Sequence, residues 1–312
     1  MAFAWLWTPH SKSETAPAVG DQYVGMGKQV LCLRNPWPAD SAFMGKMYAT
    51  TFFLWIFFWI GEHQSSNENS GDLLVDIGII FLPPLFLFLP LILYRTYFIR
   101  RQSNFYFNRH TQQVYFRNGK NLYVGEWSRV QAGMVGQTEF SGRSVSTSYY
   151  LLVNVFGTEP GGADDRRLAK EWMPMRSIRL DSNEPSDPRR IFVAQVWEYL
   201  REFMAHGPDK LPLPQEPHWW HVPHNNICLT PAQAWRHYAP WRTGEPGELQ
   251  GKKWWLLPLW AVLFPYNLFA ALSWWVTCRV LRVRPAEPPP EAFEGEAGPL
   301  VTLEMAARGI RP

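Results

Sequence analysis

Residues 73–94 read LLVDIGIIFLPPLFLFLPLILY, and Asp76 is the one charged side chain in this run. A helix of about 20 apolar residues crosses the hydrocarbon core of a bilayer, which is ~30 Å thick. Pro83, Pro84 and Pro90 would break a helix in water, but a membrane helix tolerates proline because neighbouring groups satisfy the freed carbonyls. The run therefore predicts a transmembrane helix.

A second apolar run, FMGKMYATTFFLWIFFWI, occupies residues 43–60, and its one charge, Lys46, lies near the start, where it can snorkel to the interface. The connecting residues 61–72 contain acids but no Lys or Arg. Basic residues mark the cytoplasmic side of membrane proteins. The two runs therefore predict a transmembrane helical hairpin over residues 43–99, with its loop outside and both flanks in the cytoplasm. The flanking basic residues are Lys12, Lys28, Arg34 and Lys46 before the hairpin, and Arg95, Arg100, Arg101 and Arg109 after it.

A third apolar run, WWLLPLWAVLFPYNLFAALSWWV, covers residues 254–276 and has a tryptophan pair at each end, which is typical of membrane interfaces. Basic residues flank it on both sides, so both of its ends are predicted to be inside. Residues 264–267, Phe-Pro-Tyr-Asn, are a turn signal. Two forms stay open for residues 254–278: a single kinked span, or a shallow re-entrant or in-plane hairpin. The flanking basic residues are Lys252, Lys253, Arg279, Arg282 and Arg284.

The composition excludes two classes of protein. Hydrophobic residues make up 46% of the 312 residues and aromatic residues 16%, which excludes a disordered chain. The net charge of +3 is too small to favour a nucleic-acid partner. The three cysteines, Cys32, Cys228 and Cys278, have no pairing pattern, and we expect reduced thiols in a cytosolic setting.

Residues 100–212 are predicted to form a cytoplasmic β-rich domain. Short apolar strands alternate with turns, and Asn118-Gly119 is a strong hairpin signal. From Asp187-Pro188 the pattern changes to helical spacing and ends at Gly207-Pro208. The helix has a buried stripe of Phe192, Val196, Tyr199, Leu200 and Phe203, and an expected exposed face of Glu198, Arg201 and Glu202.

The predicted fold class is an α+β membrane protein. It combines the transmembrane hairpin, the antiparallel β-rich domain capped by its amphipathic helix, and a C-terminal hydrophobic helical segment. A curved sheet closed by a C-terminal helix is the architecture of pleckstrin-homology-like domains. The remaining parts are predicted as a cytoplasmic N-terminal segment (1–42), a connector rich in Pro, Trp and His (213–253), and a disordered tail rich in Pro and Glu (285–312).

The sharpest chemical cluster is His218-Trp219-Trp220-His221-Val222-Pro223-His224. Three histidines could supply zinc ligands, but Pro217 and Pro223 favour an extended chain that separates the side chains. We therefore predict no metal, no cofactor and no catalytic residues, and keep His218, His221 and His224 as weak metal candidates.

Two stretches carry a family resemblance, FNRHTQQVYFRNG (residues 107–119) and WEYLREFMAHGPDKLP (residues 197–212). They resemble a family of uncharacterised proteobacterial inner-membrane proteins with an N-terminal transmembrane pair, a cytoplasmic domain and a hydrophobic C-terminal segment. In layout, the resemblance covers residues 35–284. Such families are often encoded beside polymorphic toxins and type VI secretion effectors, so the resemblance implies an immunity or accessory role.

These observations predict a non-enzymatic, multi-pass protein of the bacterial inner membrane. Its cytoplasmic domain would bind a protein partner, a co-encoded effector or secretion component, while the hydrophobic segments hold it in the lipid bilayer. Two alternatives stay open: a metal-dependent membrane enzyme using the histidine cluster, and a module that senses membrane lipids. The basic residues expected at the membrane interface are Lys46, Arg95, Arg100, Arg101, Lys252, Lys253, Arg279 and Arg282.

Overall fold

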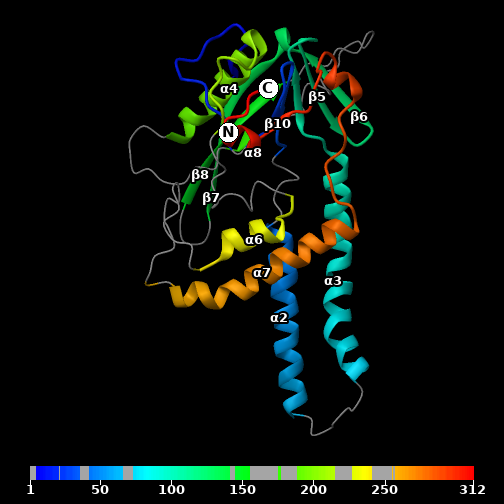
Figure 1. Ribbon diagram of the computed structural model, residues 1–312. Coiled ribbons are helices and arrows are strands. Elements are labelled where there is room, and N and C mark those ends of the chain that lie inside the picture. The colour runs from blue at the N-terminus through cyan, green and yellow to red at the C-terminus, as the bar shows by residue number, and fades with distance from the viewer. Residues whose placement is uncertain are drawn as a thin grey trace. The chain divides into compact units, whose positions relative to one another are not determined.

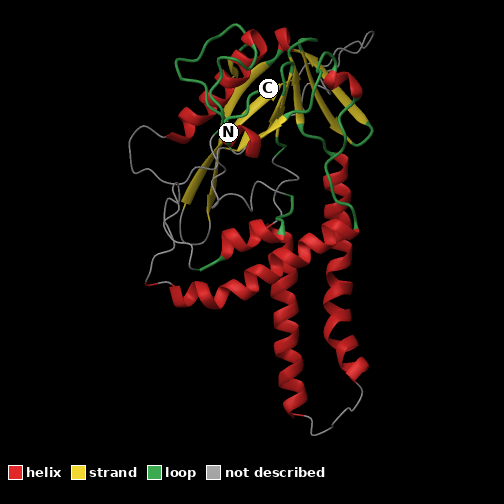
Figure 2. Ribbon diagram, viewed as in Figure 1, coloured by secondary structure: helices red, strands yellow, loops and turns green. Residues whose placement is uncertain are grey.

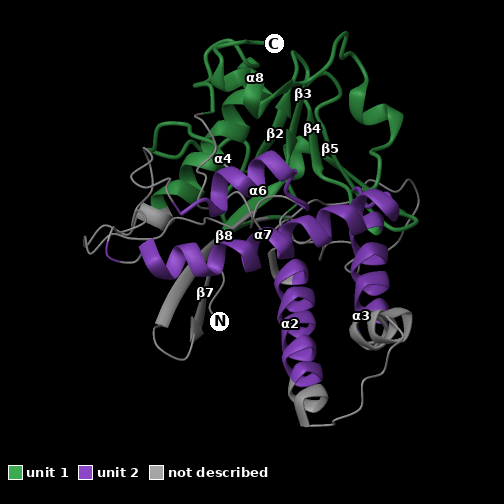
Figure 3. Cartoon of the chain, turned by 60° about the horizontal axis from the view of Figure 1, so that its bottom comes forward, with its two compact units in different colours: residues 1–37, 101–221, 285–312 green, residues 38–100, 222–284 purple. Residues whose placement is uncertain are grey.

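The computed structural model describes residues 5–20, 22–35, 42–65, 73–140, 145–154, 175–176, 188–214, 227–240, 255 and 257–312. The chain divides into two compact units. Unit 1 combines residues 1–37, 101–221 and 285–312, and unit 2 combines residues 38–100 and 222–284 (Figure 3). Unit 1 holds the strands, and unit 2 holds the long apolar helices (Figure 2). The chain is therefore a mixed α+β protein.

Unit 1 contains a six-stranded antiparallel sheet in the order β10-β2-β3-β4-β5-β6. The β5–β6 hairpin confirms the turn predicted around Asn118-Gly119. Asn118 pairs with Asn121, and Gly119 has the positive φ of 66° that such a turn requires. The strands are β2 (Tyr23–Met26), β3 (Val30–Leu33), β4 (Phe105–Asn108), β5 (Gln113–Asn118), β6 (Asn121–Glu126) and β10 (Val301–Thr302).

A second, four-stranded antiparallel sheet has the order β1-β7-β8-β9. Its centre is the long pairing of β7 with β8, which runs from Gln131↔Asn154 to Phe140↔Val145. The short 3-10 helix η1 (Trp127–Arg129) joins β6 to β7. The strands are β1 (Trp5–Trp7), β7 (Gln131–Phe140), β8 (Val145–Asn154) and β9 (Met175–Arg176).

Helix α4 (Pro188–His206) closes the core of unit 1, as the helical spacing predicts. Trp197, Tyr199, Leu200 and Phe203 are completely buried in one cluster with side chains of both sheets. The Trp197 ring stacks on Trp127, with centroids 5.4 Å apart. The helix ends at Gly207, whose φ is 82° and whose N–H donates to the Phe203 carbonyl at 2.8 Å.

The N-terminal segment is an integral part of the six-stranded sheet, which the sequence did not predict. Strand β3 pairs with β4 in the register Leu31↔Phe107, although the two helices α2 and α3 separate them in the chain. Leu31, Leu33, Phe105 and Phe107 are all buried. The strand VLCL has no polar alternation because both of its faces are covered, and such a short run is hard to identify from periodicity.

The C-terminal segment 285–312 was expected to be a disordered tail, and the structure differs from this expectation. It forms the 3-10 helix η4 (Pro290–Phe293), strand β10 and the short helix α8 (Leu303–Ala307). β10 pairs with β2 through Val301↔Met26 and Thr302↔Gly25. The composition gave no sign of this because the segment is held by the short β10–β2 pairing, by hydrogen bonds between side chains and main-chain groups far apart in the sequence, and by a few small buried side chains, among them Ala292 and Ala306.

Unit 2 contains four described helices: α2 (Ala42–Ser65), α3 (Leu73–Arg101, whose last residue belongs to unit 1), α6 (Pro231–Tyr238) and α7 (Leu257–Val280) (Figure 1). The helices α2, α3 and α7 coincide with the three apolar runs of the sequence. Helix α6 begins with a capping box, in which the Thr230 side chain accepts from the Gln233 N–H and the Gln233 side chain accepts from the Thr230 N–H.

Helix α7 is one continuous helix through Pro265. The turn expected at residues 264–267, and with it the re-entrant hairpin, is therefore wrong. The residues after the proline are packed as well as helical: the Tyr266 hydroxyl donates to the Lys46 carbonyl on α2, and Asn267 is buried. Among the described residues, a search by length and composition finds α7 long and apolar enough to cross a membrane, and it finds a shorter apolar stretch, Met44–Ile60, in α2.

Candidate functional site

The most distinctive surface of unit 2 is apolar. Phe57 on α2 is 79% exposed, and Val262 on α7 is 74% exposed. Large apolar side chains are exposed along all three long helices of unit 2, and extensive exposed apolar surface is a sign of a membrane or a binding partner. The exposed apolar side chains are Phe53, Leu54, Phe57, Phe58 and Ile60 on α2; Phe86, Leu89, Leu91, Leu93, Tyr94 and Tyr97 on α3; and Leu259, Val262, Leu263, Val276 and Val280 on α7.

Helices α2 and α7 pack closely where they cross. A Cβ atom on Gly45 would lie 2.3 Å from the Ala270 carbonyl oxygen, so only glycine permits this approach. The Tyr266 hydroxyl lies 2.7 Å from the Thr50 hydroxyl and donates to the Lys46 carbonyl at 3.1 Å. Phe269 stacks on Phe52, with centroids 5.0 Å apart. The crossing is specific, and it involves the first part of α2 and the middle of α7.

The structure brings some of the predicted interface residues together. The Arg100 guanidinium at the end of α3 donates to the Leu281 carbonyl, just beyond α7 and beside Arg282. Arg279 lies over the Trp275 ring at 5.2 Å, and Arg95 over the Phe98 ring at 5.7 Å. Basic groups from α3 and α7 thus border the apolar surface at one end of unit 2.

The other predicted residues are not part of this cluster. Lys46 is exposed in the first half of α2. Arg101 is the last residue of α3 and belongs to unit 1, where its carbonyl accepts from the Gly119 N–H at 2.6 Å. Lys252 and Lys253 lie outside the described residues, as do His218, His221 and His224. Within the described part of the chain, no group of three or more His, Cys, Asp or Glu side chains could hold a metal ion.

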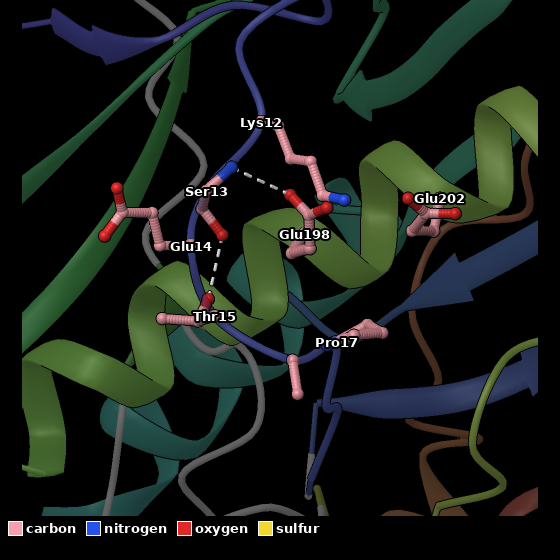
Figure 4. Close-up of a pocket in the computed structure, with 8 residues that line it drawn as sticks. Lys12, Ser13, Glu14, Thr15, Pro17, Glu198 and Glu202 are labelled. Atoms are coloured by element: carbon pink, nitrogen blue, oxygen red, sulfur yellow. Dashed lines mark hydrogen bonds between the residues drawn. The ribbon is translucent and has the colours of Figure 1, made fainter.

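Unit 1 carries a pocket between α4 and the N-terminal residues 12–17, with a volume of about 480 Å³. Figure 4 shows Glu198 on α4 beside Lys12 and Ser13, and Glu202 lines the same pocket further along the helix. The Glu198 carboxylate accepts from the Ser13 N–H at 3.1 Å, and the Ser13 and Thr15 hydroxyls lie 2.8 Å apart.

Glu198 was expected on the exposed face of α4, and it is 1% exposed instead. Burial alone would raise its pKa, but hydrogen bonds from the Arg201 guanidinium and from Ser13 hold the pKa below its usual value. Arg201 Nε lies 3.1 Å from one carboxylate oxygen, and Arg201 Nη2 lies 2.6 Å from the other. The arrangement anchors the N-terminal residues on α4. Helical spacing gave no signal for it, because the covering segment lies 185 residues away in the chain.

Comparisons with protein-family models, with curated proteins and with solved structures find no match to this chain. The resemblance to proteobacterial inner-membrane proteins stays a prediction.

Proposed function

We propose that the chain is a bacterial inner-membrane protein that holds a protein-binding domain at the cytoplasmic face. In this proposal α2 and α3 form the transmembrane hairpin, and unit 1 is the cytoplasmic domain. The observation that carries it is the pairing of β3 with β4 around an insertion of two apolar helices. Hydrogen-bonded strands share one side of a membrane, so the insertion must cross an even number of times, and two helices with exposed apolar side chains satisfy this condition.

The orientation follows from charge. Residues 61–72, which connect the two apolar runs, carry no Lys or Arg, whereas both flanks of the hairpin are basic. The positive-inside rule then puts unit 1 in the cytoplasm. Two antiparallel sheets with α4 closing their common core are compatible with a pleckstrin-homology-like domain.

The partner surface that fits best is the edge of the six-stranded sheet at β6. β6 is the last strand in the sheet order, and Leu122 on it is 41% exposed. Because the two-residue turn closes on the pair Asn118↔Asn121, residues 122 and 124 direct their main-chain N–H and C=O groups away from β5. An extended segment of a partner could pair there by β-addition. The family resemblance names the class of partner, a co-encoded toxin or effector of a secretion system.

A co-purification experiment tests partner binding. The chain is expressed with the effector encoded beside it, and recovery of that effector with the solubilised chain is measured. Leu122→Pro removes one outward N–H donor while the pairing of β5 with β6 is kept, and Leu122→Thr is the matched control. We expect wild type and Leu122→Thr to retain the effector and to protect cells from it, and Leu122→Pro to lose both. Absence of binding and protection by the wild type contradicts the proposal.

A further inference from the structure

The C-terminal segment is bonded into unit 1 by contacts with separate parts of that unit. The Tyr23 hydroxyl donates to the Val301 carbonyl at 2.7 Å, next to the β2–β10 pairing. The Asn108 side-chain amide donates to the carbonyls of Ala292 and Glu294, at 3.2 and 2.9 Å.

Two further anchors fix the segment at other points. The Glu296 carboxylate accepts from the main-chain N–H groups of Lys28, Gln29 and Val30, at 3.2, 2.8 and 3.0 Å. Arg311 donates to the Asp209 carbonyl at 2.9 Å. Residues 285–312 therefore lie on the same side of any membrane as the described strands and α4 of unit 1.

The attachment of residues 285–312 to unit 1 limits how many times residues 222–284 can cross a membrane. The chain leaves unit 1 after residue 221 and returns at residue 285, so this segment must cross the membrane an even number of times. It contains one apolar run long enough to cross, the run that forms α7. A single crossing by α7 would put β10 and β2 on opposite sides of the bilayer and break their pairing.

We propose that α7 does not span the membrane and lies in the plane of its cytoplasmic interface instead; this inference rests on the proposed hairpin. Figure 1 and Figure 3 both show α7 running across α2. Its contacts with α2 involve residues 45–53, the part of α2 that follows the cytoplasmic flank. Helix α7 thus crosses the hairpin where the proposed topology puts the inner interface.

Helix α7 is apolar around its whole circumference, so its surface alone fits a span as well as an in-plane position, and the return of the chain to unit 1 decides between them. Asn267, Ala270, Trp274 and Cys278 are buried at helical spacing on one stripe. Leu259, Val262, Val276 and Val280 are exposed elsewhere on the helix, where they can contact acyl chains. Basic residues flank α7 in the sequence, Lys252 and Lys253 before it, Arg279 in its last turn and Arg282 after it, so anionic headgroups can contact both ends from the same side. An in-plane helix explains why both of its flanks are basic, which a single span does not.

Thiol labelling with a membrane-impermeant maleimide tests the inference in intact and permeabilised cells. Single substitutions are Ser66→Cys between α2 and α3, Lys210→Cys on unit 1, and Ile310→Cys near the C-terminus. The wild-type chain, with its three native thiols, is the background control. We expect Ser66→Cys to react in intact cells, and Lys210→Cys and Ile310→Cys to react only after permeabilisation.

The outcomes separate the two proposals. If Ile310→Cys reacts in intact cells together with Ser66→Cys while Lys210→Cys stays protected, α7 spans and the inference is overturned, but the hairpin stands. If Ser66→Cys reacts only after permeabilisation, the proposed hairpin fails.

A depth measurement tests the position of α7 directly. Nitroxide labels are introduced at Leu259, Leu263, Val276 and Val280 in the full chain, reconstituted in phosphatidylethanolamine and phosphatidylglycerol vesicles. A spanning helix changes depth by ~1.5 Å per residue, so Leu263 would lie about 6 Å deeper than Leu259. An in-plane helix keeps all four labels near the interface. A depth that increases steadily toward the middle of α7 would overturn the inference.

Discussion

Helix α7 and the C-terminal segment 285–312 are neighbours in the chain and differ in how they are held. Helix α7 exposes much of its apolar surface and contacts α2 at one close crossing. The C-terminal segment is polar and rich in proline, yet its main chain is bonded to β2, and its Glu296 side chain to the turn between β2 and β3. Hydropathy identifies α7 from the sequence. It does not identify the structure of residues 285–312, because hydrogen bonds to the main chain leave no pattern in side-chain polarity.

The difference matters for topology. Apolar content alone would assign α7 as a membrane span, since its length and composition suffice. The polar segment 285–312 argues against a single crossing, because its strand β10 pairs with β2 in a sheet whose other strands all precede α7 in the chain. The pairing of strands far apart in the sequence therefore determines whether a hydrophobic helix between them can be a single membrane span.

The largest expected effect is on the stability of the unit 1 core, against which the N- and C-terminal segments pack. Trp197→Ala removes a completely buried ring that stacks on Trp127, and we expect the free energy of unfolding of unit 1 to fall by about 3 to 5 kcal/mol. Denaturant titration of the full chain in detergent measures it. Ile191→Ala, on the same helix but 41% exposed, is the control and should change stability far less. Equal effects would contradict the capping role of α4.

The next effect concerns the C-terminal segment itself. Glu296→Ala removes the acceptor of three main-chain N–H groups, and we expect a loss of about 2 to 3 kcal/mol, because hydrogen bonds to charged groups are among the stronger ones. Faster proteolytic removal of the C-terminal residues should accompany it. Glu294→Ala is the matched control, since it is the main-chain carbonyl of Glu294 that bonds to Asn108. Unchanged proteolysis of Glu296→Ala would show that this anchor is not needed.

The crossing of α2 and α7 should respond to a single methyl group. Gly45→Ala places a Cβ against the Ala270 carbonyl, and overpacking costs about 1 to 3 kcal/mol. The better helix propensity of alanine offsets about 1 kcal/mol of that cost. We expect a net loss of about 1 kcal/mol in detergent. Leu54→Ala, at an exposed position of α2, should leave the crossing intact. A stabilised Gly45→Ala variant would contradict the close approach.

The smallest expected effect is a pH dependence. The folded protein holds the pKa of Glu198 below its usual value, so the carboxylate stabilises the fold above the ordinary Glu pKa of about 4.3. That contribution is lost as pH falls through the lowered folded-state pKa. Acidification from about pH 6 to about pH 3 should therefore destabilise wild type more than Glu198→Gln. Parallel curves of unfolding free energy against pH for the two chains would refute the role of Glu198.

Sequence patterns predicted the elements that depend on residues close together in the chain. The three apolar runs became α2, α3 and α7, the hairpin signal became the β5–β6 turn, and the helical stripe became α4. The elements that were missed depend on distant partners. Strand β3 is recognisable only beside β4, β10 only beside β2, and the burial of Glu198 only once Ser13 lies over it.

The candidate membrane surface was predicted in part. The sequence located the basic residues at the ends of the apolar runs, but it could not bring Arg100 to the end of α7. It also left the form of α7 open. The helix continues through Pro265, where the sequence indicates a turn, and its proposed in-plane position depends on the return of the chain to unit 1.

Cross-linking of the segment after α4 to the C-terminus tests the central claim, that three separate segments fold into one unit on one side of the membrane. Asp209→Cys and Arg311→Cys are combined in one chain, because Arg311 bonds to the Asp209 carbonyl, and a permeant bis-maleimide is added to intact cells. We predict an intramolecular cross-link for this pair and none for Ser66→Cys with Arg311→Cys. A cross-link of Arg311→Cys to Ser66→Cys, with none to Asp209→Cys, would contradict the account.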